Sequence, residues 1–369
     1  MTALRPTRVE VGLDAVRHNV RVLKPPGSAL MAVVKADAYG HGDVAVARAA
    51  LEAGASWLGV ALVEEGLSLR SAGVDAPILV LSEFPPGSER EALGSGLTPS
   101  VYTDRGLSGL RDAGARGVGV HVKVDTGMHR AGVYPPEDTA PFVDRVVRAG
   151  CRLDALWTHF ASSAEDEKTT LGQLERFLQV VEEVRADGHA PAMLHAANSG
   201  ATILYPESHL DLVRTGIAVY GLEPAPGVGA DLGLRPALTW RSEVSMTRRL
   251  PAGERVSYGH RYRIDREANV VTVPVGYADG YPRLLSSRAD VLIRGRRCRV
   301  AGSVTMDQLI VDCGDLPVEP GDDVVLLGRQ GDEVVTAEEL AGHADTIGYE
   351  IVTRIGARVP RVPVAGGST

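Results

Sequence analysis

The sequence predicts a TIM barrel followed by a mostly antiparallel β domain, and two patterns lead to this expectation. In the first part of the chain, eight apolar runs of strand length alternate with helix-like stretches. This alternation is typical of parallel strands joined by crossover helices, and eight such units within roughly 200–250 residues have the size of a TIM barrel. From about Pro236 onwards, short β-branched runs are separated by turn signals, as in an antiparallel sheet.

The order of these elements sets the expected domain boundary. A helix over 13–23 comes first, because Val16, Val20 and Leu23 recur at helical spacing. Barrel strands are expected at 30–35, 57–62, 78–81, 99–102, 118–124, 153–157, 193–196 and 210–213, and helices at 43–53, 63–72, 104–113, 141–149 and 165–187. The later strands are expected at 244–247, 270–275, 290–293, 300–304, 308–311 and 324–327, with helices at 337–344 and 349–354. We therefore expect a barrel at 1–235 and a β domain at 236–369, with the first few residues packed on the β domain.

A doubly wound open sheet is the alternative for the first part of the chain. A dinucleotide-binding version of that fold carries a Gly-x-Gly-x-x-Gly turn after its first strand, and the sequence has none there. The barrel is therefore the favoured architecture.

Composition excludes several classes of function. The chain has 369 residues, a net charge of −8 and scattered basic residues, so nothing indicates a nucleic-acid-binding surface. Its first residues hold no apolar segment of signal-peptide length, and no apolar run is long enough to span a membrane; we expect a cytoplasmic protein. The three cysteines are far apart without metal-ligand spacing, which favours small core residues and no bound metal.

One lysine stands out at the end of the first barrel strand. Among 39 lysines and arginines only Lys24, Lys35, Lys123 and Lys168 are lysines. An arginine cannot lose its proton or form an imine, whereas a lysine can. Lys35 ends an apolar strand, and a desolvated lysine is the usual Schiff-base nucleophile. A lysine that merely extends its amine to solvent from a strand end is the alternative.

Other polar residues end the predicted barrel strands, where TIM-barrel chemistry is located. They are Lys35 with Tyr39 after strand one, Lys123 to Arg130 at strand five, His159 at strand six, His195, Asn198 and Ser199 at strand seven, and Arg214, Gly216 and Ile217 at strand eight. A lone histidine is more often a satisfied core residue. The convergence of so many polar ends on one rim favours a catalytic site.

The pattern on this rim points to pyridoxal 5′-phosphate. That cofactor needs a lysine for its imine, a phosphate clamp and a partner for its ring nitrogen. Asn198, Ser199 and Gly216 follow strands seven and eight, the common phosphate site of TIM barrels. Arg214 is the candidate partner of the ring nitrogen. Because an arginine stays protonated, it would donate to an unprotonated nitrogen and weaken the electron sink.

With these residues in view, the chain resembles the bacterial alanine racemases, and the resemblance runs nearly end to end. It is carried by several motifs in a fixed order. In the first part these are Ala-Val-Val-Lys35-Ala-Asp-Ala-Tyr39, Lys123-Val-Asp-Thr-Gly-Met-His-Arg130, Thr158-His159-Phe, Ala197-Asn198-Ser199 and Arg214-Thr-Gly216-Ile217. In the second part they are Val256-Ser-Tyr258-Gly, Val275-Gly-Tyr277, Thr305-Met306-Asp307-Gln and Ile347-Gly-Tyr349-Glu.

The resemblance implies an enzyme that interconverts L- and D-alanine, supplying D-alanine for peptidoglycan. It implies a homodimer in which Lys35 serves one face of the substrate and Tyr258 of the partner subunit serves the other. A chain from Tyr258 through His159 to Arg214 would activate the phenol. The cofactor would be held by Lys35, Tyr39, Asn198, Ser199, Arg214, Gly216, Ile217 and Tyr349, and the substrate would be bound or enclosed by Arg130, Met306, Tyr277 and Asp307.

Lys123 has a separate expectation. In the family the matching lysine is often carbamylated, which converts a cation into an anion able to orient Arg130. An unmodified Lys123 beside Arg130 would place two like charges in a confined site, which is costly. We therefore expect Lys123 to be an N6-carboxylysine.

Three other functions compete with alanine racemisation. A racemase of another amino acid, such as serine, would share the scaffold, although Met306 and two entrance tyrosines, Tyr277 and Tyr349, favour a small pocket. A decarboxylase of the same architecture would have no use for the motif around Tyr258. A non-catalytic carrier of pyridoxal phosphate would resemble the barrel alone and leave the β domain without a role.

Overall fold

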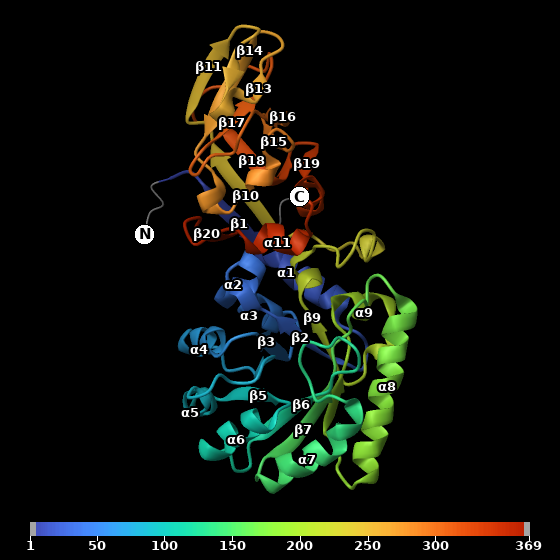
Figure 1. The fold of residues 1–369 in the computed structure, drawn as a ribbon. Coiled ribbons are helices and arrows are strands. Elements are labelled where there is room, and N and C mark those ends of the chain that lie inside the picture. The colour runs from blue at the N-terminus through green and yellow to red at the C-terminus, as the bar shows by residue number, and fades with distance from the viewer. Residues whose placement is uncertain (1–4, 365–369) are drawn as a thin grey trace. The chain divides into compact units, whose positions relative to one another are not determined.

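The computed structural model of the chain describes residues 5–364, which form two compact units (Figure 1). The first, which we call the barrel unit, comprises residues 16–38 and 43–234. The second, the β unit, comprises residues 39–42, the described part of 1–15, and the described part of 235–369. Among residues 5–364, no helix is both long and apolar enough to cross a membrane.

The described part of the barrel unit contains an eight-stranded parallel sheet that nearly closes on itself, which confirms the predicted TIM barrel. Its spatial order is β8-β7-β6-β5-β4-β3-β2-β9. The two edges meet through backbone bonds, from Asp211 N to Leu194 O at 3.1 Å and from Arg214 N to Ala197 O at 2.9 Å. The strands are β2 (Ala29–Val33), β3 (Trp57–Val60), β4 (Ile78–Val80), β5 (Leu97–Val101), β6 (Gly119–Lys123), β7 (Arg152–Trp157), β8 (Met193–His195) and β9 (Leu212–Thr215).

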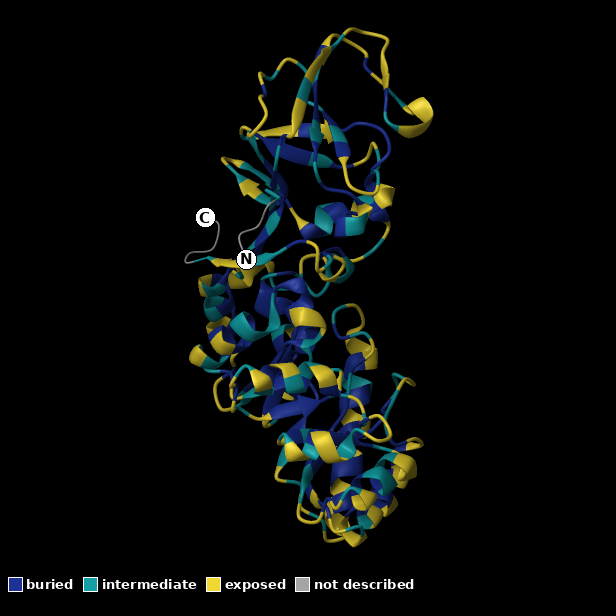
Figure 2. Ribbon diagram, turned by 90° about the vertical axis from the view of Figure 1, so that its left-hand side faces the viewer, coloured by how far each residue is buried: buried dark blue, intermediate teal, exposed yellow. Residues whose placement is uncertain are grey.

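Helices connect these strands and cover the barrel. Figure 2 shows buried strands in this unit, with exposed residues on the outer faces of the helices. Side-chain oxygens cap several helix starts: Thr103 accepts from Gly106 N, and Asp166 from Thr169 N, both at 3.0 Å. The helices are α1 (Leu13–Leu23), which begins in the β unit, then α3 (Asp43–Glu52), α4 (Val63–Ser71), α5 (Glu89–Gly94), α6 (Asp104–Asp112), α7 (Thr139–Arg148), α8 (Glu167–Ala186) and α9 (Ser199–Leu204).

The described part of the β unit is built on a ten-stranded sheet. Its main path runs β11-β14-β17-β16-β15-β18-β10-β1-β20, and β19 pairs with β18. The pairings are antiparallel except for β1 with β20, which are parallel. The strands are β1 (Arg8–Gly12), β10 (Leu238–Glu243), β11 (Met246–Leu250), β14 (Ala268–Val273), β15 (Asp290–Ile293), β16 (Arg296–Val300), β17 (Leu309–Asp312), β18 (Asp323–Gln330), β19 (Glu333–Val335) and β20 (Arg361–Val364).

Smaller elements complete the β unit. The strands β12 (Arg255–Val256) and β13 (Tyr262–Arg263) form a hairpin beside the main sheet, and α10 (Ala337–Ala344) and α11 (Gly348–Thr353) follow β19. An apolar cluster supports the hairpin, formed by the buried residues Val256, Ile264, Ala268, Val270 and Ala301.

Some sequence-based expectations for these elements were wrong. β1, β10, β12, β13, β19, β20, α5 and α9 were not predicted. The strand expected at 300–304 instead ends at Val300, where a buried turn follows. Val244, expected inside a strand, lies between β10 and β11. β1, β10 and β20 were missed because their stability comes from pairing with residues far away in the sequence and not from a local apolar run.

Candidate active site

Most of the predicted barrel residues lie at the C-terminal end of a strand. Lys35 follows β2 and begins α2 (Lys35–Gly40), and Lys123 is the last residue of β6. His159 comes just after β7, and Ser199 begins α9 after β8. Arg214 was expected at the end of its strand but lies inside β9. The structure therefore brings these side chains to one rim of the barrel.

The turn that follows Lys35 winds left-handed. Ala36, Asp37, Ala38 and Tyr39 all have φ between 51° and 54°, and Gly40 has φ of 80°. For residues other than glycine this conformation costs roughly 1–2 kcal/mol each, so it persists only where other contacts impose it. The sequence alone predicts only that Tyr39 follows strand one, without this left-handed turn.

The carboxylate of Glu65 anchors this turn, and it was not among the predicted site residues. Its Oε1 accepts from Ala36 N at 2.6 Å, and its Oε2 accepts from Ala61 N at 2.8 Å and from Leu62 N at 3.1 Å. Three backbone donors therefore converge on one carboxylate and hold the start of the left-handed turn against α4.

The amine of Lys35 is half-buried and makes no hydrogen bond or ion pair with any residue in the described range. Burial is the main cause that lowers its pKa, and the charge of Arg130 lowers it further, while Glu65 opposes the change. A lowered pKa increases the fraction of neutral amine, which is the nucleophilic form. This amine is therefore suited to bond a carbonyl carbon.

Arg214 is buried and has most of its donors committed. Its Nη2 donates to Thr158 O at 2.7 Å and to Ala196 O at 3.0 Å, and lies 3.3 Å from His159 Nδ1. Its Nη1 donates to His195 Nδ1 at 3.0 Å. Its Nε has no acceptor among residues 5–364, so the Nε–H of this fixed guanidinium remains available to a ligand atom.

His195, which contacts Arg214, is paired with His121, and this pair was not predicted from the sequence. Because Arg214 is always a donor, His195 must accept at Nδ1 and carry its proton on Nε2. That proton points to His121 Nδ1, 3.1 Å away. Burial lowers the pKa of both rings, that of His121 to about 4, so both remain neutral. The one available signal was spacing: His121 stands two residues before Lys123, on the same face of β6.

His159 is neutral for the same reason. Burial lowers its pKa well below the usual value, and the charges of Arg214, Lys123, Arg130 and Lys35 add to the effect. A neutral imidazole whose Nδ1 faces Arg214 has its Nε2 free to exchange a proton with another group.

Lys123 is a second buried amine on the rim. Its Nζ lies 4.6 Å from the centroid of the Trp157 ring, and the guanidinium of Arg214 lies 4.8 Å from the same centroid. Burial, followed by the charges of Arg130 and Arg214, lowers the pKa of Lys123 to about 8. Asp125 is the nearby anion, but its Oδ1 already accepts from Gly127 N and His129 N at 3.0 Å.

The region after β8 and β9 offers backbone donors for an anion. Ser199 Oγ accepts from Gly216 N at 2.8 Å, which ties the two loops together. Ser199 and Ile217 stand at the first positions of α9 and of the 3₁₀-helix Ile217–Tyr220, where an N–H has no acceptor within the helix. Asn198 is engaged internally, since its Oδ1 accepts from Ala201 N at 3.1 Å and from Ser163 Oγ at 2.6 Å.

In the β unit, Tyr39 and Tyr349 lie together. Their ring centroids are 6.2 Å apart. Burial raises the pKa of both phenols, that of Tyr349 to about 12. Both hydroxyls therefore keep their protons and can donate to an anion such as a phosphate.

The remaining predicted residues of the β unit are exposed. Tyr258, Met306 and Tyr277 are 75%, 53% and 40% accessible, respectively. Tyr258 begins a short turn after Ser257, whose φ is 64°. Ser257 Oγ donates to Ser303 O at 2.7 Å, and Ser303 Oγ donates to Tyr258 O at 3.3 Å, which ties this turn to the segment that carries Met306.

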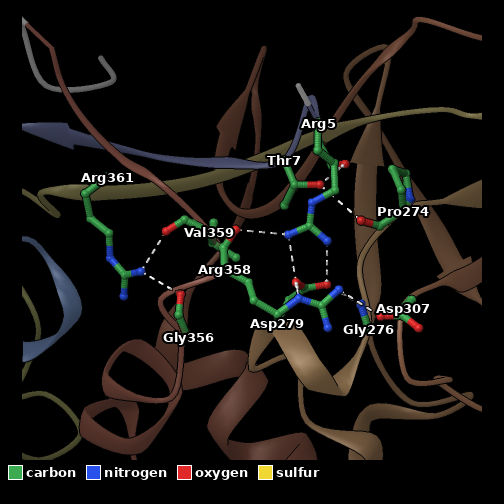
Figure 3. Close-up of polar contacts among 11 residues, drawn as sticks. Arg5, Thr7, Pro274, Gly276, Asp279, Asp307, Gly356, Arg358, Val359 and Arg361 are labelled. Carbon is green, nitrogen blue, oxygen red and sulfur yellow. Dashed lines mark hydrogen bonds and ion pairs between the residues drawn. The ribbon is translucent and has the colours of Figure 1, made fainter. Parts of the chain in front are cut away.

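A network of arginines and aspartates supports that segment (Figure 3). Arg5 donates twice to the buried carboxylate of Asp279, at 3.1 and 2.7 Å, and Asp279 Oδ2 accepts from Gly276 N at 3.0 Å. Arg358 Nε lies 3.4 Å from the same carboxylate, and its Nη2 donates to Asp307 at 2.8 Å. The carboxylate of Asp307, predicted to bind substrate, is thus paired with Arg358 beside Met306.

The backbone of the Met306 segment is fixed by the neighbouring turn. Tyr277 N donates to Thr305 O at 2.9 Å, and Ala278 N donates to Met306 O at 3.0 Å. Gly276 packs so closely that an added Cβ would overlap the carbonyls of Thr305 and Met306. The position of Met306 therefore depends on backbone contacts that leave no room for a side chain.

Comparison with known proteins decides the family. Residues 11–224 match the family described as "Alanine racemase, N-terminal domain", and residues 237–363 match "Alanine racemase, C-terminal domain". The chain belongs to the alanine racemase family. Family membership confirms the expected racemase class and its dependence on pyridoxal phosphate.

Relatives of this racemase match over nearly the whole chain. The alanine racemase of Symbiobacterium thermophilum is 52% identical over 381 residues, covering 100% of this chain and 99% of that protein. The alanine racemase structure from Streptomyces lavendulae has a TM-score of 0.93 at 44% identity, covering 99% of this chain and 98% of the other. A structure from Bacillus anthracis with bound L-Ala-P has a TM-score of 0.93 at 37% identity, covering 99% and 96%.

A more distant structural neighbour is a racemase of another amino acid. The histidine racemase from Leuconostoc mesenteroides has a TM-score of 0.91 at 29% identity, covering 98% of this chain and 99% of the other. The same fold therefore occurs in racemases with different names, and substrate choice has to be argued from the site.

Proposed function

We propose that this racemase interconverts L- and D-alanine by moving the α-proton between two bases on opposite faces of the substrate. The observation that supports this most is the amine of Lys35, half-buried, with a lowered pKa and without a partner among the described residues. The Nζ of Lys35 would take or return the proton on one face. The phenol of Tyr258 of the partner subunit would do so on the other.

The barrel rim fits pyridoxal phosphate. Lys35 supplies an amine for its aldehyde, the Nε of Arg214 lacks an acceptor among the described residues, and the rim clusters cations that suit anionic groups. Bound there, the cofactor would delocalise the electron pair left when the α-proton departs. We assign its binding to Lys35, Arg214, Ser199, Gly216, Ile217, Tyr39 and Tyr349, with Asn198 holding the loop in shape.

The other residues would position and activate these groups. His159, neutral and in reach of Arg214, would exchange the proton of Tyr258, while Arg214 Nη2 fixes the orientation of its ring. Arg130 and Met306 would bind the substrate carboxylate, and Tyr277 would line the entrance. Asp307, paired with Arg358, would support Met306 and not contact the substrate through its carboxylate.

A homodimer would complete each site. Tyr258 and Met306 would remain exposed in a lone chain, and Leu284 and Ile347 of the same unit are 61% and 60% accessible. Large apolar side chains that are this exposed fit burial in an interface. Their burial against a second copy would shield the reacting groups from water.

Lys123 is proposed to carry a carbamate. A pKa of about 8 leaves part of this buried amine neutral near physiological pH, and a neutral amine adds to carbon dioxide, giving a carbamate and releasing one proton. The product replaces one of several clustered cations with an anion that can hold Arg130. Intact mass and an electron-density map from protein prepared under carbon dioxide would show it; a bare amine would refute it.

The experiment that tests the two-base proposal mixes inactive variants. Lys35→Ala and Tyr258→Phe should each abolish racemisation. Equal mixing should regain about a quarter of the wild-type activity, since half of the dimers formed are mixed and each has one intact site. Tyr262→Phe, a tyrosine of the same unit outside the site, is the control and should stay active. No recovery on mixing would contradict a shared site.

Substrate choice is tested separately. A panel of L-alanine, L-serine and L-histidine should give the highest kcat/KM with alanine, because Tyr277, Tyr349 and Met306 leave room for a small side chain. A carrier without catalysis would instead give no turnover, while Tyr258→Phe kept its cofactor absorbance. A role in supplying D-alanine for peptidoglycan predicts that cells without the gene need external D-alanine.

A further inference from the structure

Two of the three cysteines face each other across neighbouring strands of the β unit. The antiparallel register of β16 and β17 pairs Arg299 with Asp312 and Val300 with Val311. The same register, continued by one residue, sets Cys298 opposite Cys313. All three cysteines, predicted from their spacing to be small core residues, are buried and free.

The backbone hydrogen bonds between β16 and β17 show whether Cys298 and Cys313 form a hydrogen-bonded or a non-hydrogen-bonded residue pair. Ala301 N donates to Ile310 O at 2.7 Å, which makes 301 with 310 a hydrogen-bonded pair. Pair types alternate along an antiparallel ladder, so Cys298 with Cys313 is a non-hydrogen-bonded pair. In such pairs the Cα atoms are about 4.5 Å apart and the side chains are closest. A disulfide needs Cα atoms about 4.4–6.8 Å apart, so the backbone already meets that requirement.

Both thiols point to the same side of the sheet. Cys298 and Cys313 are 4% and 8% accessible, and Val300 and Val311, next along the same face, are fully buried. Cys298 Sγ donates to Arg296 O at 3.7 Å, and the two thiols are close enough for each to change the pKa of the other. The neighbouring thiol of Cys313 lowers the pKa of Cys298, whereas the pKa of Cys313 is raised.

We propose that Cys298 and Cys313 form a reversible disulfide when the protein meets hydrogen peroxide. The thiolate of Cys298 attacks one peroxide oxygen, which breaks the O–O bond, releases hydroxide and leaves a sulfenic acid. The sulfur of Cys313 then displaces the hydroxyl from Cys298, forming the S–S bond and losing its proton. In sum, two thiols and one peroxide give one disulfide and two waters. A thiol reductant reverses the bond.

The bond would enclose a functional segment. Residues 299–312 lie between the two cysteines, and they include Thr305 and Met306. A cross-link that closes a short loop restricts the motion of its residues. Oxidation would therefore stiffen the segment that presents Met306, whether or not the proposed role of Met306 in substrate binding is correct.

Cys151 provides an internal comparison. It lies in the barrel unit, is buried, and its Sγ donates to Ala115 O at 3.6 Å. Both other cysteines of the chain belong to the β unit. Cys151 should therefore remain a free thiol under conditions that oxidise the pair.

The test is mass spectrometry on the holoenzyme treated with graded hydrogen peroxide. The protein is then unfolded in denaturant that contains an alkylating agent and no reductant, so that every remaining free thiol is alkylated. We expect wild type to lose two hydrogens, to alkylate only Cys151 and to yield one cross-linked peptide pair holding Cys298 and Cys313. Dithiothreitol should restore both thiols, and Cys151→Ser should behave like wild type. Cys313→Ser should give no cross-link and accumulate Cys298 sulfenic acid.

Hydrogen exchange supplies a second readout. Amides of residues 301–308 should exchange more slowly in the oxidised form, and Cys313→Ser should abolish that difference. Peroxide can also oxidise the exposed thioether of Met306, but a sulfoxide adds an oxygen whereas the disulfide removes hydrogens. Alkylation of all three cysteines after peroxide treatment, or overoxidation of Cys298 without a cross-link, would overturn the proposal.

Discussion

At the residue scale, burial determines what each titratable side chain can do. Lys35 and Lys123 are both amines with a lowered pKa, and burial is the main cause in each case. Lys35 follows its strand and faces no fixed partner among residues 5–364, which suits an amine that must form and break bonds. Lys123, at the end of β6, lies over the ring of Trp157. A fixed position of this kind suits the proposed reaction with carbon dioxide, after which the carbamate stays in place.

Three neutral histidines predict how stability depends on pH. Burial lowers the pKa of His121, His159 and His195, whereas in the unfolded chain each has a pKa of about 6.5. Below pH 6.5 the unfolded state therefore binds more protons, and stability falls as pH drops, by up to about 1.4 kcal/mol per pH unit for each histidine.

Urea unfolding between pH 7.5 and pH 5 measures this slope. Replacing His121 by Asn should flatten it by about one proton, and His18→Asn, outside the network, serves as the control. An unchanged slope in His121→Asn would show that this ring is not held neutral in the fold.

Some of the site residues could be predicted from the sequence, and others could not. Lys35, His159 and Arg214 were predicted because chemically distinctive side chains end apolar strands. The contact between His121 and His195 was not, because β6 and β8 are not neighbours in the sheet; β7 lies between them. Only the closed barrel brings their inward faces together.

At the element scale, the left-handed turn after β2 is the feature on which the position of Lys35 depends. The residue types in Ala-Asp-Ala-Tyr do not predict a positive φ at four successive positions. Only Gly40 is of a type that commonly adopts positive φ. By contrast, the bounds predicted for α1 and α10 agree with the structure, because amphipathic spacing and capping are local properties. Elements held by distant partners, such as β1 and β20, cannot be predicted in this way.

Glu65→Gln tests the anchor of that turn. The glutamine side chain has an NH2 group in place of one carboxylate oxygen, so at least one of the three backbone N–H groups would face a donor and lose its acceptor. We therefore expect the free energy of unfolding to fall by about 1–3 kcal/mol. The variant should also release cofactor more readily on dialysis, measured by visible absorbance. Glu64→Gln, its exposed neighbour on α4, is the matched control. Equal cofactor retention in both variants would argue against the anchoring role.

Gly276→Ala tests how the Met306 segment is held. The added Cβ overlaps the carbonyls of Thr305 and Met306, so the segment must shift, and misplacement by about 1 Å can cost on the order of 100-fold in rate. We expect kcat/KM for alanine to fall by at least about tenfold. Gly342→Ala, where an added Cβ meets nothing within 4 Å, should leave kcat/KM unchanged. Unaltered kinetics in Gly276→Ala would mean that this segment does not position substrate.

At the scale of the whole molecule, the predicted site residues fall into two groups. The barrel unit holds Lys35, Arg130, His159 and Arg214, and the β unit holds Tyr258, Tyr277 and Met306. The fold class followed from the alternation of elements in the sequence. The oligomeric state did not, because a subunit interface leaves no periodic signal in one chain.

A shared site predicts that activity requires the dimer. Sedimentation should give a particle of twice the 39.0 kDa chain mass, and specific activity should decline on dilution together with the dimer fraction. As the control, particle mass and specific activity are measured at each dilution, because simple inactivation would lower the activity without changing the mass. Full activity in a monomeric fraction would contradict the proposed arrangement.

The most direct test of the central claim is to locate the covalent bond between protein and cofactor. The loaded enzyme is reduced with borohydride, digested and mapped by mass spectrometry. We expect the added mass of the reduced cofactor on the peptide that contains Lys35, and no such mass in Lys35→Arg. A label on Lys123, or no fixed label in an active enzyme, would contradict it.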